Sequence, residues 1–151
     1  MQLKNAPSLT TLAFSTRTTL PELNAFVRTV ARQLYREAAR LDLEVTGPII
    51  WQYEGVDGKP DTIFALDILL PIQSAQGEPA DNLAFKQVAA FSCASVEHLG
   101  PWDELVIVYP SLRSRLVQKG YQQGALSREV YINMDFDNPA NNVTEIQVQV
   151  L

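Results

Sequence analysis

The residues best suited to chemistry lie in the stretch SREVYINMDF, residues 127–136. Its alternating pattern predicts a β-strand on which Glu129 and Tyr131 share one face. The opposite, apolar face would carry Val130, Ile132 and Met134. A carboxylate beside a phenol can accept a hydrogen bond, balance a cation or take a proton as a general base. Because aromatic and polar residues are also common on solvated sheet faces, a purely structural Glu129 is the competing interpretation.

An aromatic partner for Glu129 is expected from the first half of the chain. In IIWQY, residues 49–53, strand alternation places Trp51 and Tyr53 on one face. Aligning Tyr53 with Tyr131 sets Trp51 opposite Glu129. Aromatic rings attract cations by about 0.5–2 kcal/mol each, and burial raises the pKa of a carboxylate. We therefore predict a small-molecule site formed by these three aromatic residues and Glu129.

Two similar sets of elements would position these strands. The first half predicts a strand, an amphipathic helix and two strands, at residues 9–17, 20–42, 49–53 and 62–72. The second half repeats that order at residues 85–97, 101–119, 125–134 and 143–151. We therefore predict one domain, residues 1–151, with repeats at about 8–71 and 84–151 and a polar linker at about 72–83.

Two β-α-β-β units related by a pseudo-twofold axis predict an α+β fold, with one antiparallel sheet and both helices on one face. The uncovered face would curve into a ligand cleft. Val130 would then face the helices, and Glu129 would face the cleft. Pro110 lies within the second helix, where it removes a hydrogen bond and clashes one turn back. A kink or break is expected between Val106 and Ser111.

Composition limits the classes of partner. The 151 residues carry a formal net charge of -5, and the sequence shows no basic cluster, which argues against binding to nucleic acid or to an anionic membrane. The sequence shows neither the apolar segment of a signal peptide nor a run long enough to span a bilayer. We expect a cytoplasmic protein with a small-molecule partner and no cofactor.

The sequence does not favour a metal or nucleophilic site. Cys93 and His98 are the only residues of their types, and Cys93 lies in an apolar run typical of a buried residue. His98 is expected at the end of a strand. Asp135 and Asp137 begin like a calcium loop, but no glutamate closes it, so a turn is the better interpretation. The motifs of serine hydrolases and nucleotide-binding loops are absent.

Two segments carry a resemblance to a known family. HLGPWDEL, residues 98–105, resembles the H-x-G-P-Y-x-x-L segment of effector-binding domains in AraC-type and multidrug-responsive transcription regulators. REVYINMDFDNPANNVTEIQVQV, residues 128–150, resembles the E-x-Y…D-x-P…T-E-I…P-V ending of the same domains, also called gyrase-inhibitor-like small-molecule-binding domains. Gln147 and Val148 stand where the family often has a proline.

The resemblance covers about residues 8–151 and implies a duplicated fold with a central ligand cleft. It also implies that Glu129 lies in that cleft among aromatic residues, where the regulators meet cationic, lipophilic ligands. Trp102 stands where the family commonly has tyrosine and joins the expected ligand-binding residues.

Three functions remain open from the sequence. The favoured one is a stand-alone effector-binding protein that holds a cationic or amphipathic molecule. Some stand-alone relatives are reported as hydrolases, so the second is a small hydrolase of a reactive or strained electrophile, with Glu129 as general base. The third is a gyrase-inhibitor-like role in binding a protein. No helix-turn-helix remains after the two repeats are assigned, so no direct contact with DNA is expected.

Overall fold

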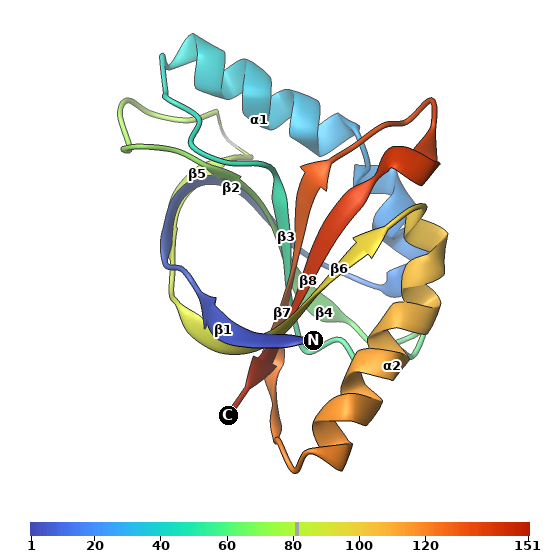
Figure 1. Ribbon diagram of the computed structural model, residues 1–151. Helices are drawn as coiled ribbons and strands as arrows, with labels where there is room; N and C mark the ends of the chain where they lie inside the picture. The colour runs from blue at the N-terminus through green and yellow to red at the C-terminus, as the bar shows by residue number, and fades with distance from the viewer. Residues whose placement is uncertain (81) are drawn as a thin grey trace.

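A single antiparallel sheet organises the chain in the computed structural model, which describes residues 1–80 and 82–151 (Figure 1). Its eight strands are β1 Gln2–Ala6, β2 Leu9–Thr18, β3 Ile50–Glu54, β4 Phe64–Pro71, β5 Ala84–Val88, β6 Phe91–Leu99, β7 Gln123–Asn133 and β8 Val143–Val150. Their order across the sheet is β1-β6-β8-β7-β3-β4-β2-β5. The α+β class with one antiparallel sheet is thereby confirmed.

The strand order is symmetric about the central pair, β3 and β7. One half of the sheet runs β3-β4-β2 and the other β7-β8-β6, the arrangement that two β-α-β-β units about a twofold axis predict. The duplication itself and the repeat boundaries stay predictions. Two strands were not foreseen: β1 extends the sheet beside β6, and residues 89–90 divide the expected strand 85–97 into β5 and β6.

Both α-helices cover the same face of the sheet, as predicted. α1 (Thr29–Arg40) packs Val30 and Leu34 in a cluster that includes Ile68. α2 (Leu105–Gln118) packs Leu112 and Leu116 in a cluster that includes Ile146. Ile68 pairs with Trp51, Trp51 with Glu129, and Glu129 with Ile146 across neighbouring strands, so all four side chains share one face. We call this side the helix-bearing face.

The first helix differs from its prediction. Residues 20–42 form a 3₁₀ helix, η1 (Leu20–Phe26), followed by α1. Arg28, between them, has φ 66°, a left-handed backbone that a continuous α-helix cannot contain. Hydrophobic spacing alone cannot distinguish two short helices from one long helix, because both place apolar residues on a single face.

The second helix also differs. It begins with a 3₁₀ turn, η2 (Trp102–Glu104), and α2 then continues without a break through Pro110. The predicted break is therefore wrong. Val106, whose carbonyl would accept the missing bond, lies at the exposed start of α2. Water can hydrate that carbonyl there, which lowers the cost of the proline.

No helix in the described residues has the length and hydrophobicity needed to cross a membrane.

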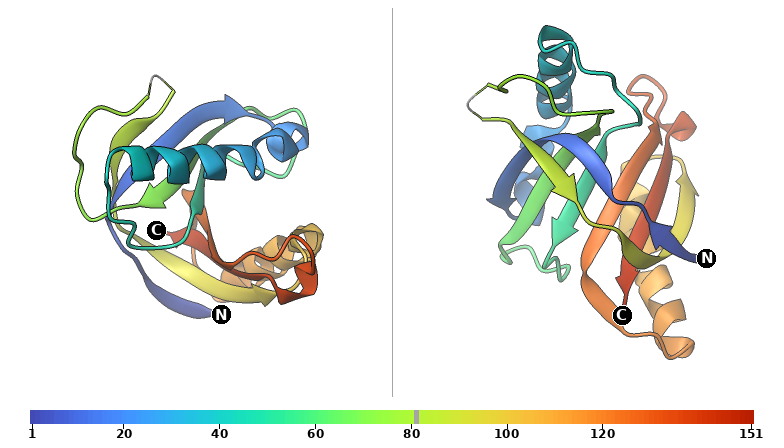
Figure 2. Two further views of the ribbon diagram at one scale, coloured as in Figure 1. Left: turned by 90° about the horizontal axis from the view of Figure 1, so that it is seen from above. Right: turned by 90° about the vertical axis from the view of Figure 1, so that its left-hand side faces the viewer.

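The cleft was predicted on the wrong face. Figures 1 and 2 show the sheet strongly curled, with both α-helices outside the curl. The side away from the helices, which we call the inner face, closes on itself around Ala13, Ile50, Leu69 and Val130. Val130 thus faces away from the helices, and the opening lies on the helix-bearing face between α1 and α2. Arg128 and Glu129, on opposite faces of β7, are both buried, so alternation alone could not tell which face carries the helices. Ile132, predicted on the core face, is 48% exposed.

Candidate ligand-binding site

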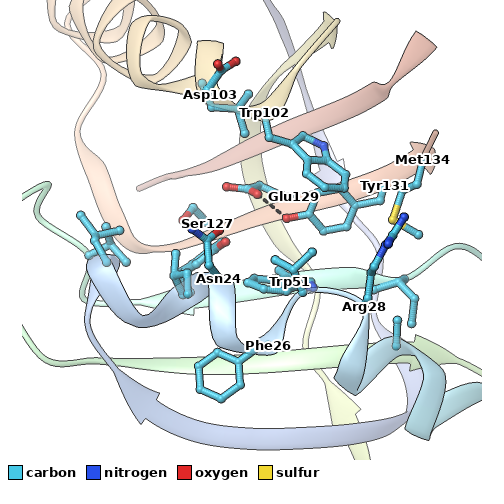
Figure 3. A pocket seen from close by; sticks show the side chains of 18 of the residues that line it. Asn24, Phe26, Arg28, Trp51, Trp102, Asp103, Ser127, Glu129, Tyr131 and Met134 are labelled. Carbon is cyan, nitrogen blue, oxygen red and sulfur yellow. Dashed lines mark hydrogen bonds between the residues drawn. The ribbon is translucent and has the colours of Figure 1, made fainter. Parts of the chain in front are cut away.

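A pocket of about 1030 Å³ opens between the two helices on the helix-bearing face. β3 and β7 form its floor, while η1 with α1 and η2 with α2 form its walls. It is lined by the five residues selected from the sequence, namely Trp51, Tyr53, Trp102, Glu129 and Tyr131. Figure 3 shows Trp51, Trp102, Glu129 and Tyr131 among them. The register also places Trp51 directly opposite Glu129, as predicted. The volume suits a lipophilic molecule of drug size.

The aromatic side chains form a fixed, edge-on cluster. The ring centroids of Trp51 and Tyr131 lie 6.1 Å apart at an interplanar angle of 86°. Trp102 meets Tyr131 at 5.4 Å and 70°. The Trp102 indole also donates a hydrogen bond to the Thr144 hydroxyl at 3.1 Å. Edge-to-face contacts and this hydrogen bond hold the rings in place, so the pocket has a preformed aromatic wall.

Glu129 is buried in the floor of the pocket, with 7% of its surface exposed. Tyr109 donates a hydrogen bond to its Oε1 at 2.8 Å, and Tyr131 donates one to its Oε2 at 2.5 Å. The contact expected between Glu129 and Tyr131 is therefore present. Among the described residues, no Lys, Arg or His nitrogen lies within 4 Å of this carboxylate. The carboxylate is hydrogen-bonded, but its charge has no adjacent counter-ion there.

Burial sets the protonation behaviour of this group. Desolvation raises the pKa of Glu129, while hydrogen bonds from Tyr131, Tyr109 and Tyr53 partly offset that rise. Burial also raises the pKa of all three tyrosines well above the ordinary value, and the Glu129 charge adds to this effect. The phenols therefore remain protonated donors. A cation or hydrogen-bond donor placed beside Glu129 would stabilise its charged form.

Some pocket residues were missed by the sequence analysis. Tyr109, on α2, lies four residues after Leu105 and three before Leu112, so helical spacing could have placed it on the buried side. Met134 was assigned to the face opposite Glu129. It lines the pocket instead, because it lies beyond the end of β7 and the register shifts between Tyr131 and Asn133.

Three further residues that the sequence analysis considered do not line the pocket. His98 lies near the end of β6, where its Nε2 is 3.0 Å from the Glu104 carboxylate. Asp135 accepts backbone hydrogen bonds from Asp137 and Asn138, which confirms a turn. Cys93 is buried. Within residues 1–80 and 82–151, no three His, Cys, Asp or Glu side chains converge as metal ligands.

Comparison with known families decides the relationship. The model of the GyrI-like small molecule binding domain matches residues 1–151. The chain belongs to this family. This confirms the resemblance found in the sequence, and the GyrI-like fold places Glu129 and the aromatic cluster in one pocket. No curated protein matches the sequence.

Solved structures share the GyrI-like fold at low sequence identity. The EcmrR C-terminal domain is 20% identical, with 99% of this chain and 96% of that chain covered and a TM-score of 0.78. In the EcmrR-DNA complex in EcmrR-RPo the TM-score is 0.81 at 20% identity, and the match covers 99% of this chain but only 56% of the EcmrR chain. SAV2435 bound to tetraphenylphosphonium is 16% identical, with coverage of 99% and 93% and a TM-score of 0.65. A hydrolase from Listeria innocua is 12% identical, with coverage of 99% and 91% and a TM-score of 0.68.

Proposed function

We propose that this GyrI-like domain binds a lipophilic small molecule and holds a cationic or hydrogen-bond-donating group of that molecule against Glu129. The observation that carries the proposal is the buried carboxylate at the floor of an aromatic pocket. Among the described residues, no Lys, Arg or His side chain lies close enough to balance the charged form of Glu129, and the pocket leaves room beside it. The ligand-binding residues are Glu129, Trp51, Tyr53, Tyr131 and Trp102.

The physical argument has two parts. Aromatic rings offer a ligand a large apolar area and attract cations through their electron-rich faces. A cation beside Glu129 would recover part of the free energy lost when the carboxylate was desolvated. A structure of the relative SAV2435, which shares this fold, has the lipophilic cation tetraphenylphosphonium bound. That cation is therefore a suitable probe.

The experiment uses intrinsic fluorescence. Both tryptophans of the chain, Trp51 and Trp102, line the pocket, so quenching reports directly on its occupancy. Tetraphenylphosphonium should quench the fluorescence saturably and raise the melting temperature. Glu129→Gln should weaken binding by about tenfold or more, because a buried charge-assisted contact is lost. Glu54→Gln, at an exposed position of β3, is the matched control and should bind like the wild type.

Dependence on pH provides a second readout. Because the pKa of Glu129 is raised, a larger fraction is protonated at mildly acidic pH than for an ordinary glutamate. Cation affinity should rise as pH rises through that raised pKa and then level off once Glu129 is fully ionised. The Glu129→Gln variant should show no such rise. Absence of saturable binding, or equal affinity in this variant, would overturn the proposal.

A hydrolase is the second candidate function. The raised pKa of Glu129 favours it, because a general base works best when its pKa lies near the operating pH. The Listeria innocua hydrolase also shares the fold. Both Glu129 oxygens already accept tyrosine hydroxyls, so a water would have to displace or share one of them. Turnover of a reactive ester or epoxide that disappears in Glu129→Gln would support this function over simple binding.

A further inference from the structure

Positive charge gathers at the mouth of the pocket, although the chain as a whole is acidic. Four of its 12 Lys and Arg residues line the pocket, all of them arginines, namely Arg28, Arg32, Arg36 and Arg113. Of its 17 Asp and Glu residues, the described pocket lining contains only Asp103 and Glu129. This local reversal of charge is not explained by a role in holding lipophilic cations.

The arginines on the α1 side follow one face of the helix. In α1, positions 32, 36 and 40 are spaced by four residues and therefore lie along one stripe, and Arg28 directly precedes the helix. Arg40, at the far end, pairs with Glu37 at 2.5 Å and does not line the pocket. Within the described part of the chain, Arg28, Arg32 and Arg36 have no carboxylate within 4 Å. Only the arginine outside the pocket is neutralised there.

Aromatic rings hold two of the four guanidinium groups at the mouth. The Arg28 guanidinium lies 3.9 Å from the centroid of the Phe136 ring. Figure 3 shows Arg28 reaching toward Met134 at one side of the pocket. On the α2 side, the Arg113 guanidinium lies 5.7 Å from the Tyr109 ring. Stacking on a ring positions a guanidinium while leaving its N–H groups available to bind an acceptor.

The pocket is thus polarised from floor to mouth. Glu129 is buried at the floor, whereas Arg28, Arg32 and Arg36 are exposed at the mouth. A ligand whose only polar group is a cation would be attracted by Glu129 at the floor but repelled by the arginines at the mouth. A lipophilic molecule with an acidic group at its outer end would avoid that repulsion. The planar guanidinium group binds carboxylates, sulfonates and phosphates through paired hydrogen bonds.

Building on the proposed function, we infer that the ligand carries an acidic group at the exposed end of its lipophilic body, and that Arg32, Arg36 and Arg113 determine this preference. Any hydrogen-bond-donating or cationic group would lie at the inner end, beside Glu129. The ligand class is an amphipathic organic acid, or a zwitterion, with an aromatic or aliphatic body.

Two fluorescent probes that differ by one acidic group test this inference. 8-Anilino-1-naphthalenesulfonate carries a sulfonate, and N-phenyl-1-naphthylamine has the same skeleton without it. The wild type should bind the sulfonate probe about tenfold more tightly, and added salt should reduce the difference. The triple variant Arg32→Gln, Arg36→Gln, Arg113→Gln should lose most of this preference, since only Arg28 of the four pocket arginines remains. Arg115→Gln, which removes an exposed charge from α2 outside the pocket, should keep the preference.

The possible outcomes distinguish a failure of this inference from a failure of the proposed function. Equal, saturable binding of both probes to the wild type would overturn the inference and leave the proposed function standing. An undiminished sulfonate preference in the triple variant would also overturn it, because these three arginines would then not determine the preference. If neither probe nor tetraphenylphosphonium binds, both proposals fail. Because the substituted arginines are exposed or half-buried, far-UV circular dichroism should show the triple variant folded.

Discussion

The substitution Arg128→Met tests what holds the inner face of the sheet together. Arg128 has 1% of its surface exposed and lies on the opposite side of β7 from Glu129. Its Nε donates a hydrogen bond to Gln52 Oε1 at 2.6 Å. Its two terminal nitrogens donate to the carbonyls of Pro7 and Ala89, each at 2.9 Å. One guanidinium therefore bridges two connecting segments, the one between β1 and β2 at Pro7 and the one between β5 and β6 at Ala89.

The size of the effect follows from these three bonds. A hydrogen bond from a charged donor contributes about 1.5–3 kcal/mol, so three contribute at least about 4–5 kcal/mol. Methionine fills a similar apolar volume but leaves all three acceptors without a donor. Pro7 and Ala89 are exposed residues, so water can reach their carbonyls after a small opening. We therefore expect a net loss of about 3 kcal/mol, or about 6–12 °C in melting temperature for a chain of this size.

Urea and thermal unfolding, followed by circular dichroism, measure this loss. Arg128→Lys should be intermediate, because one ammonium group cannot reproduce three fixed N–H directions. Arg115→Met, at an exposed site on α2, is the control and should change stability by no more than about 0.5 kcal/mol. The folded Arg128→Met variant should still bind pocket ligands, since Arg128 faces away from the pocket.

The reasoning would be refuted by an Arg128→Met variant as stable as the wild type. The inner face would then be an ordinary apolar core that merely tolerates a cation. A variant with normal stability but lost ligand binding would be equally contrary, because it would couple Arg128 to the pocket rather than to the strand links.

Three further predictions concern single residues. Glu129→Gln should leave the free energy of unfolding within about 1 kcal/mol of the wild type or raise it, because the amide removes a buried charge. Since the pKa of Glu129 is raised on folding, any advantage of this variant in urea unfolding should grow as pH rises through that pKa. The pKa of Glu37 is lowered to about 2 by its hydrogen bonds from Arg40 and the Ala80 amide. Its contribution should be present above the pKa of an unfolded glutamate and lost as pH falls toward about 2, so wild type and Glu37→Gln should converge in acid. Pro110→Ala should raise stability by about 1–2 kcal/mol in urea unfolding, because it restores a helical hydrogen bond; an unchanged or lower stability would show that the proline is already well accommodated.

The grouping of side chains on the central strands could be predicted, because strand alternation and the observed register place the same residues together. Trp51, Glu129 and Tyr131 were placed together from strand periodicity and the symmetric order of elements, and the structure pairs Trp51 with Glu129 across β3 and β7. A period of two residues fixes which side chains share a face. The sequence therefore contained enough information to bring these pocket residues together.

The location of the opening could not be predicted in the same way. It depends on the curl of the sheet, which packs the partly buried Val130 against an apolar cluster on the inner face. The outer strands β1 and β5 pair with strands far away in the sequence, so they leave little local signal. The helix break at Arg28 was equally unpredictable from the sequence. Arginine does not favour a left-handed backbone, so packing of the surrounding structure must impose this conformation.

Arg128 and Glu129 are adjacent, buried and oppositely charged, but strand alternation points them to opposite faces and prevents them from pairing. Each charge is hydrogen-bonded where it lies, Arg128 by three acceptors and Glu129 by tyrosine hydroxyls. The two residues differ in whether a ligand can reach them. Arg128 is enclosed by fixed backbone carbonyls, while Glu129 borders a pocket of about 1030 Å³. Only Glu129 can gain a counter-charge from outside the protein, so the same strand presents a structural cation on one face and a candidate ligand anchor on the other.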